Sequence, residues 1–168
     1  MIDPIQVRHK LHQIPELAFE ELKTKAVIMD YLHKILAKDK ASMSPKFKIT
    51  EFHNSPGILI SYNGGEGDFK LFRSDMDALP VEEKTDCDFV SGHPGQMHAC
   101  GHDVHMAILT GLIQKTALEL PPENLLFLYQ PAEEGKGGAI SILEEGLIQG
   151  YPLQSAIALH VASGMPVG

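Results

Sequence analysis

Residues 103–129, DVHMAILTGLIQKTALELPPENLLFLY, contain a helix and a strand in succession, and this pair decides the fold class. Apolar residues recur at helical spacing from Asp103 onward, and Pro121-Pro122 ends the helix that this spacing predicts. The short apolar run from Leu125 to Tyr129 follows, and its length and the turn residues before it predict a buried strand. We expect one face of the helix to pack inward, and this face consists of Val104, Ala107, Ile108, Gly111 and Leu112.

The same two patterns alternate along the rest of the chain. Helical spacing and short apolar runs predict further helices at residues 3–11, 19–36 and 138–145, and strands at residues 46–52, 57–62, 69–74 and 155–160. The turn residues 63–67 (NGGEG) predict that a hairpin leads into the third strand. Helices that alternate with strands are typical of an α/β fold with three layers and a mostly parallel sheet. Residues 81–98 follow neither pattern, so we expect a long irregular loop with a functional role.

The composition favours an enzyme that acts on small molecules over a protein that binds nucleic acid or a membrane. The chain has 168 residues, 43% of them hydrophobic, which is enough for one packed domain. Its net charge of −8 offers no basic surface that would neutralise phosphate groups. No apolar run approaches the roughly 18–20 residues that a membrane-spanning helix needs. Only two cysteines and no basic-then-apolar segment at the start predict a cytoplasmic protein.

Acidic and histidine side chains stand where several predicted strands end. Asp75 and Asp77 follow the third strand, Glu133 and Glu134 follow the fourth, and His160 ends the last. Because open α/β sheets bind ligands at the carboxyl ends of their strands, these distant segments should converge on one crevice. Such convergence is what a metal site requires.

The segment Cys100-Gly101-His102-Asp103 brings a thiol, an imidazole and a carboxyl group together where the long loop meets the helix. Zinc prefers thiolate and imidazole ligands, and a carboxylate extends the choice to manganese or cobalt. The alternative is a buried free cysteine beside a helix that is capped by Asp103. The local sequence leaves both interpretations open.

Two adjacent glutamates, Glu133 and Glu134, lie in the predicted loop after the fourth strand. One can bind a metal ion while its neighbour faces the attacking water, which is the division that metal-dependent hydrolysis needs. The alternative is a solvated acidic turn. Taken alone, His160 is more typical of a structural histidine. His105 lies three residues after His102, and two interpretations of it stay open. One places it beside a metal ligand or the substrate, and the other gives it a role in packing or capping.

Five strings of the sequence, in this order and at this spacing, resemble one family of metallopeptidases. This family includes aminoacylases, hippurate hydrolases, auxin-conjugate amidohydrolases and N-acetyldiaminopimelate deacetylases. The resemblance covers almost the whole chain and implies a three-layer α/β/α catalytic domain like that of zinc exopeptidases. The strings are LHQIPELAFEE (11–21), FRSDMDALP (72–80), MHACGHDVHMA (97–107), YQPAEEGKGGA (129–139) and ALHV (158–161).

The resemblance also implies roles for individual residues and for partners. Two divalent metal ions would be bound by Cys100, His102, Glu134 and His160. The ions implied are zinc, manganese or cobalt. Glu133 resembles the general base, and we interpret Asp77 as an outer residue that orients a ligand. The implied substrate is a small N-acyl amino acid, and the full-length protein is implied to be a homodimer.

Members of this family are longer and insert a smaller α/β domain, used as a lid and for dimerisation, before a final histidine ligand. Residues 1–168 are therefore expected to be the N-terminal part of the catalytic domain, truncated before the lid, and a poor catalyst alone. One alternative is a truncated, non-catalytic fragment that still binds metal. Another is a cysteine hydrolase in which Cys100 acts with His102 or His105. The intact Glu133 argues against the first alternative for the full-length protein, and the neighbouring carboxylates argue against the second.

Overall fold

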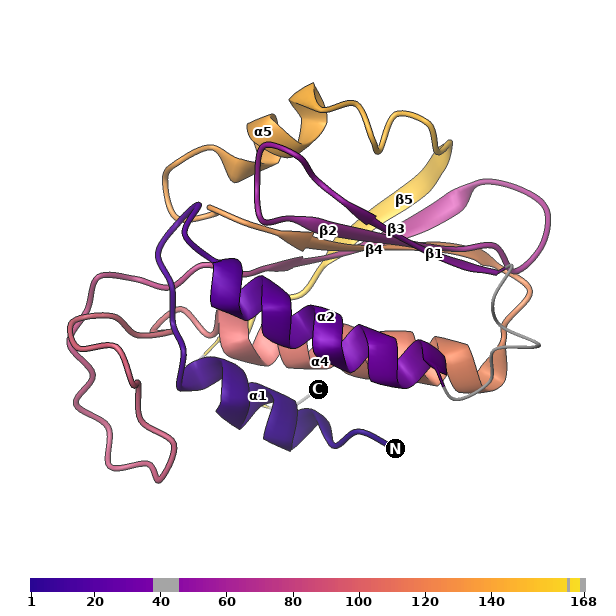
Figure 1. Ribbon diagram of the computed structural model, residues 1–168. Helices are drawn as coiled ribbons and strands as arrows, with labels where there is room; N and C mark the ends of the chain where they lie inside the picture. The colour runs from indigo at the N-terminus through magenta and orange to yellow at the C-terminus, as the bar shows by residue number, and fades with distance from the viewer. Residues whose placement is uncertain (38–45, 163, 167–168) are drawn as a thin grey trace.

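The computed structural model describes residues 1–37, 46–162 and 164–166. Its helices are α1 (Pro4–His12), α2 (Leu22–Leu36), α4 (His102–Glu119) and α5 (Gly138–Glu144), and its strands are β1 (Phe47–Glu51), β2 (Ile58–Tyr62), β3 (Phe69–Asp75), β4 (Asn124–Gln130) and β5 (Leu153–Ala158). The sheet lies between α5 on one face and α1, α2 and α4 on the other (Figure 1). The three layers and the α/β class are as expected. Within the part of the chain that is described, no helix is long and apolar enough to cross a membrane.

The strands are arranged in the order β1-β2-β4-β3-β5. β3 pairs in parallel with β4 and with β5, whereas β2 pairs antiparallel with β1 and with β4. The sheet is therefore mixed, and among the described strands β2 alone runs against the others. β1 and β2 form a hairpin, but residues 63–67 lead past β4 to β3 and not to a neighbouring strand.

Asn124, the first residue of β4, holds the segment that crosses from β2 to β3. Its side-chain oxygen accepts hydrogen bonds from the N–H groups of Gly64 and Gly65, both at 3.1 Å. Its amide nitrogen donates to the carbonyl oxygen of Gly67 at 2.8 Å. A Cβ atom at Gly64 would lie 2.3 Å from the carbonyl oxygen of Pro121, so the close approach of the two segments requires glycine at this position.

The side chains of β2 and β4 alternate between two cores, because successive residues of a strand point to opposite faces. Both strands are buried along their whole length. The core under α1, α2 and α4 includes Ile58, Ile60, Tyr62, Leu125, Phe127 and Tyr129. The smaller core under α5 includes Leu59, Leu126, Leu128, Ile142 and Ile148.

α4 forms close to where the sequence predicts it, but only part of the predicted inner face is buried. Ala107 is buried and Leu112 packs against the core, whereas Ile108 is 43% exposed. The Thr110 hydroxyl lies 2.8 Å from the Tyr129 hydroxyl in the core, so polar residues on the inner face are satisfied there. Hydrophobic spacing identifies only part of the buried face of α4, because polar side chains make up much of it. The buried residues are His102, Asp103, His105, Met106, Ala107, Leu109, Thr110, Ile113, Thr116 and Ala117.

α2 begins at Leu22 and not at residue 19 as predicted. Phe19 has a φ of 68°, in the left-handed region that a helix cannot use. The carboxylate of Glu16 accepts hydrogen bonds from the N–H groups of Lys23 and Thr24, at 3.1 and 2.8 Å. It thereby satisfies two donors at the start of α2, which places the end of the helix at this point.

Candidate metal centre

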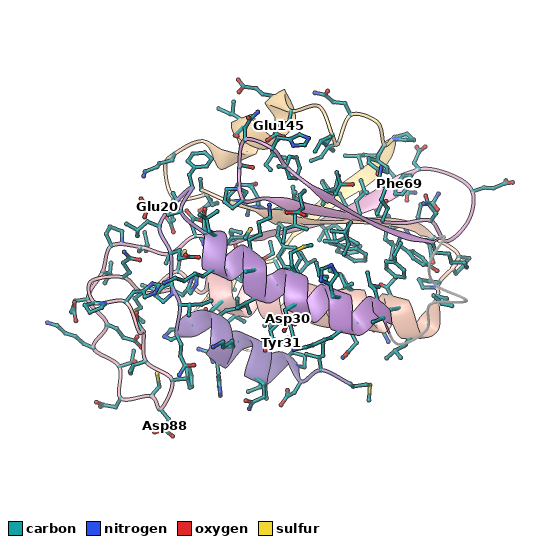
Figure 2. All side chains as sticks on the ribbon, in the orientation of Figure 1. Glu20, Asp30, Tyr31, Phe69, Asp88 and Glu145 are labelled. Atoms are coloured by element: carbon teal, nitrogen blue, oxygen red, sulfur yellow. The ribbon has the colours of Figure 1, made fainter. Side chains whose placement is uncertain are left out.

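The carboxyl ends of β3 and β4, the start of α4 and the segment after β5 meet beside the long loop 81–98. In Figure 2, Phe69 at the start of β3 lies at the opposite end of the molecule from Asp88, which belongs to this loop. β3 therefore runs toward the loop. The crevice expected at the carboxyl ends of the strands is at this end of the sheet.

His102, the first residue of α4, lies at the centre of the cluster and is fully buried. Its Nδ1 is 2.7 Å from the backbone carbonyl oxygen of Asp77. Because a carbonyl can only accept, Nδ1 carries the proton and the neutral ring has its lone pair on Nε2. Nε2 has no hydrogen-bond partner among the described residues, and it lies 3.4 Å from Oδ2 of Asp75 and 3.9 Å from Oε1 of Glu134. A buried lone pair that faces carboxylates suits a cation.

Cys100 and His160 lie on one side of this histidine. The Cys100 Sγ is 3.3 Å from Nε2 of His160, whose Nδ1 donates to the carbonyl oxygen of Val161 at 2.7 Å. His160 therefore also has its lone pair on Nε2. One ligand atom from each of Cys100, His102 and His160 lies within 4.8 Å of the others. Burial, followed by the hydrogen bond and charge of Glu134, raises the pKa of the Cys100 thiol to about 11.

Glu133 and Glu134 occupy the loop between β4 and α5. Glu133 is exposed, whereas the Glu134 side chain is 28% exposed. A carboxylate oxygen from each lies within 4.8 Å of a ring nitrogen of His102. The preceding Ala132 has a φ of 53°, a costly conformation for a residue with a side chain. The chain turns sharply here, and both carboxylates come to the cluster.

Asp77 connects the two halves of the cluster. It is buried, its carbonyl oxygen holds His102, and its Oδ2 accepts the N–H of Glu134 at 2.8 Å. Burial alone would raise the pKa of Asp77, but the hydrogen bonds from His102 and from the N–H groups of Glu134 and Glu133 lower it below its usual value. This geometry matches the orienting role that the sequence predicts for Asp77.

His105, one turn after His102, holds its neighbours in place and has no nitrogen left for a metal ion. The N–H of Val161 donates to its Nε2 at 2.9 Å, so Nδ1 carries the proton and donates to Oδ1 of Asp75 at 2.7 Å. The other oxygen of Asp75 accepts from Arg73 at 3.0 Å. Burial opposes ionisation of Asp75, yet the partners His105, His102 and Arg73 lower its pKa. His105 thus fixes both Asp75 and the segment that carries His160.

The donor atoms fit divalent cations. Three groups of three side chains share His102: one adds Cys100 and His160, one adds Glu133 and Glu134, and one adds Asp75 and His105, whose ring nitrogens are both engaged in hydrogen bonds. The buried Nε2 of His102 has no hydrogen-bond partner within the described residues. Sulfur and imidazole favour zinc, and the carboxylates admit manganese or cobalt. The four side chains predicted as ligands therefore come together, and Glu133 lies beside them.

Asp103 does not cap α4, contrary to the alternative considered for this segment. The N-cap is Gly101, with a φ of 93° and no side-chain hydrogen bond. Asp103 lies inside the first turn and is buried, and its Oδ2 accepts from Nδ1 of His12 at 2.9 Å and from Nε of Arg8 at 3.2 Å. Asp103 therefore joins α4 to α1.

Glu21 is a residue beside the centre that the sequence analysis did not single out. It is fully buried, and its Oε1 accepts the N–H of Ala132 at 2.8 Å, directly before Glu133. Burial raises the pKa of Glu21 to about 7. An acidic residue just before a helix is typical of an exposed helix start, so the local pattern points away from this contact.

Comparison with known proteins agrees with this arrangement. Residues 71–168 match peptidase family M20/M25/M40, and the chain belongs to this family. It is 41% identical over 165 residues to N-acetyldiaminopimelate deacetylase of Anoxybacillus flavithermus, and 42% identical over 165 residues to the enzyme of that name from Halalkalibacterium halodurans. These matches cover 98% of the chain and 41% and 42% of the two relatives. The chain thus spans less than half the length of these curated relatives.

Solved structures show the same fold. A Bacillus subtilis protein described as a dinuclear metal-binding peptidase of the M20 family superposes with a TM-score of 0.85 at 30% identity, over 98% of this chain and 44% of that one. A putative aminohydrolase from Staphylococcus aureus gives 0.83 at 32% identity, over 96% and 41%. The cluster of donor side chains and the family together define the class: the chain has the fold of an M20-type metallopeptidase domain, of which it spans a part.

Proposed function

We propose that this protein is a metal-dependent amidohydrolase that removes the acyl group from small N-acyl amino acids. The observation that carries the proposal is the convergence of Cys100, His102, Glu134 and His160 from separate segments of the chain, with Glu133 beside them. Membership of the M20 family supports the same reaction class. The proposal concerns the activity of the whole protein.

We assign the metal ligands as Cys100, His102, Glu134 and His160, and the ions as two of zinc, manganese or cobalt. Such ions, when bound, polarise the acyl carbonyl group and lower the pKa of the attacking water. Asp77 supports the assignment, because it fixes the ring of His102 and the backbone of Glu134 at once. Ligands held in this way stay oriented without a cation, which reduces the cost of binding one.

Glu133 is the proposed general base. The residue is exposed, and its carboxylate lies within 4.8 Å of the same histidine as Glu134, so it reaches the cluster from the solvent-exposed side. It takes a proton from the attacking water and later delivers a proton to the leaving amine nitrogen. The partly buried Glu134, tethered through its N–H, suits the ligand role.

The proposed substrates are N-acyl amino acids, with N-acetyldiaminopimelate as the first candidate. The support is the name of the relatives that are 41–42% identical over 98% of this chain. A cysteine hydrolase has less support, because burial raises the pKa of Cys100 to about 11 and a nucleophilic thiol needs a lowered pKa.

Two isosteric substitutions test the division of labour between the glutamates. Glu133→Gln should reduce turnover by roughly two to four orders of magnitude and leave the metal content unchanged, since it removes only the base. Glu134→Gln should lower the metal content as well as turnover. Metal is measured by mass spectrometry of the purified protein, and turnover by the amino acid released from N-acetyl and N-benzoyl substrates.

The exposed Glu144 lies on α5, close in sequence but outside the cluster, so Glu144→Gln is a matched control that should change neither quantity. If Glu133→Gln loses metal in parallel with activity, the roles of the two glutamates are reversed. If neither substitution alters metal content or turnover, the cluster is not the active centre.

A further inference from the structure

A second cluster of ligand-type side chains joins α1 to the loop 81–98. Nε2 of His12 is 3.1 Å from Oε1 of Glu83, and this oxygen is 3.7 Å from Sγ of Cys87. One ligand atom from each of the three residues lies within 4.8 Å of the others. None of them belongs to the candidate metal centre.

We propose that His12, Glu83 and Cys87 form a separate binding site for a thiophilic divalent cation, zinc above all. Imidazole, carboxylate and thiolate are the three ligand types of protein zinc sites. In a tetrahedral site with zinc–nitrogen and zinc–sulfur distances of about 2.0 and 2.3 Å, neighbouring ligand atoms are roughly 3.3–3.7 Å apart. The separations of 3.1 and 3.7 Å are close to this geometry.

Asp103 prepares His12 for this role. Nδ1 of His12 donates to Oδ2 of Asp103 at 2.9 Å, and the same oxygen accepts from Arg8 at 3.2 Å. With Nδ1 engaged, Nε2 is the atom that points at Glu83. A histidine that binds a metal ion through one nitrogen while a carboxylate holds the other is a recurring arrangement at zinc sites. His12 is 4% exposed, so its ring orientation is well fixed.

The cluster opens onto a cavity of about 380 Å³, whose lining includes Arg8, His12, Thr85, Cys87 and His98. His98 is 3% exposed, and neither of its ring nitrogens has a hydrogen-bond partner within the described residues. Buried polar groups are normally satisfied, so an unpartnered imidazole in this wall indicates that a polar ligand enters the cavity. A cation with three protein ligands has a fourth position left for such a ligand, for example a water molecule.

Binding releases the thiol proton of Cys87 and any proton on Nε2 of His12 to the solvent. The cation then links two segments that are far apart in sequence, residue 12 on α1 and residues 83–87 of the loop. Glu83 already anchors the loop by accepting the N–H of Ser91 at 2.5 Å. The bound cation would therefore hold the loop against α1, independently of any amide hydrolysis.

The chain has only two cysteines, which allows a direct test. In Cys100→Ser, Cys87 is the sole thiol, so titration of the 168-residue chain with cobalt(II) should produce a thiolate-to-cobalt absorption band whose final intensity corresponds to one thiolate–cobalt bond per chain. The band should disappear in the Cys87→Ser/Cys100→Ser double variant. Absence of the band in folded Cys100→Ser would overturn the proposal.

Alkylation of the unaltered chain provides a second measurement that does not depend on the folding of Cys100→Ser. Zinc should slow the alkylation of Cys87, followed by peptide mass spectrometry, by at least about tenfold, because a ligated thiolate is a poor nucleophile. Glu83→Gln should abolish the protection of Cys87 and leave that of Cys100 intact. An alkylation rate of Cys87 that zinc does not change would show that the cluster is only an ion pair beside a free thiol.

Discussion

His102 and His12 are two buried histidines that face a cysteine and carboxylates in different ways. Nδ1 of His102 donates to a backbone carbonyl oxygen, whereas Nδ1 of His12 donates to the Asp103 carboxylate. In the part of the chain that the structure describes, Nε2 of His102 has no hydrogen-bond partner, whereas Nε2 of His12 lies 3.1 Å from Glu83. The first nitrogen faces the carboxylates of Asp75 and Glu134 at 3.4 and 3.9 Å without a hydrogen bond, whereas the second has an anionic partner at hydrogen-bond distance.

The difference teaches how the acceptor on one nitrogen sets the state of the other. The carbonyl oxygen of Asp77 fixes the tautomer of His102, and the carboxylate of the same residue lies farther from Nδ1, at 3.4 Å. At His12, the hydrogen bond from Asp103 is the largest cause of a raised pKa, which burial opposes and Glu83 reinforces. Despite burial, the pKa of His102 is raised as well, by Asp77 and Asp75, so a metal ion must displace a proton from either ring. We expect the candidate metal centre to bind more tightly than the site at Cys87, because more ligand-type side chains surround His102.

The largest expected effect comes from removing each histidine in turn. His102→Asn should weaken metal binding at the candidate metal centre by more than about 100-fold, beyond the usual effect of an outer partner, and should spare the Cys87 site. His12→Asn should weaken metal binding at the Cys87 site and should spare the candidate metal centre. Zinc protection of Cys100 and Cys87 against alkylation, measured in each variant, separates the two sites. Simultaneous loss of protection at both cysteines in either variant would contradict two independent sites.

A smaller effect is expected from the acidic partners. Asp103→Asn removes the charged acceptor of His12 and should weaken the Cys87 site by up to about 100-fold, whereas Asp77→Asn leaves the carbonyl that holds His102 and should weaken the centre by only about tenfold. Zinc affinity is measured by competition with a chelator. Asp88 lies on the exposed part of the loop, so Asp88→Asn is the matched control. If Asp103→Asn and Asp77→Asn lower the zinc affinity of their sites equally, the charge of the histidine's acceptor does not distinguish the two sites.

The sequence predicted the elements well because their local patterns are strong. Most strand and helix bounds differ from the prediction by only a few residues, and the chemistry-bearing residues cluster as expected at the carboxyl ends of strands. These predictions succeed because hydrophobic periodicity and turn residues act over short distances. The sequence did not predict that β4 lies between β2 and β3, because strand order depends on contacts between distant segments.

The inner face of α4 shows why burial was harder to predict. Periodicity selected Ile108, yet the buried side presents His102, Asp103 and His105 to partners on other elements. A polar residue is buried only when a distant partner satisfies it, and one sequence does not reveal that partner. For the same reason the contacts of Glu21 with Ala132 and of His12 with Glu83 became visible only in three dimensions.

The smallest expected effect is a dependence of stability on pH that His12 contributes when metal is removed by a chelator. The pKa of His12 is raised in the folded chain, so its contribution is fully present below the unfolded value of about 6.5 and is lost as pH rises through the folded pKa. The pKa values of Asp103 and Glu83 are lowered, for Glu83 to about 2, so their contribution is lost only in acid.

The network should therefore stabilise the fold most between about pH 4.5 and 6.5, by roughly 1.5–3 kcal/mol, the usual range for hydrogen bonds to charged groups. His12→Asn removes the titrating group and keeps a neutral donor beside Asp103. Urea unfolding of both proteins at about pH 5.5 and 8.5 should show a stability difference that shrinks at the higher pH. The pKa of His102 is also raised, so only the difference between the two proteins isolates His12. A difference that stays constant with pH would mean that the folded and unfolded chains bind the His12 proton equally, so that Asp103 and Glu83 do not raise its pKa.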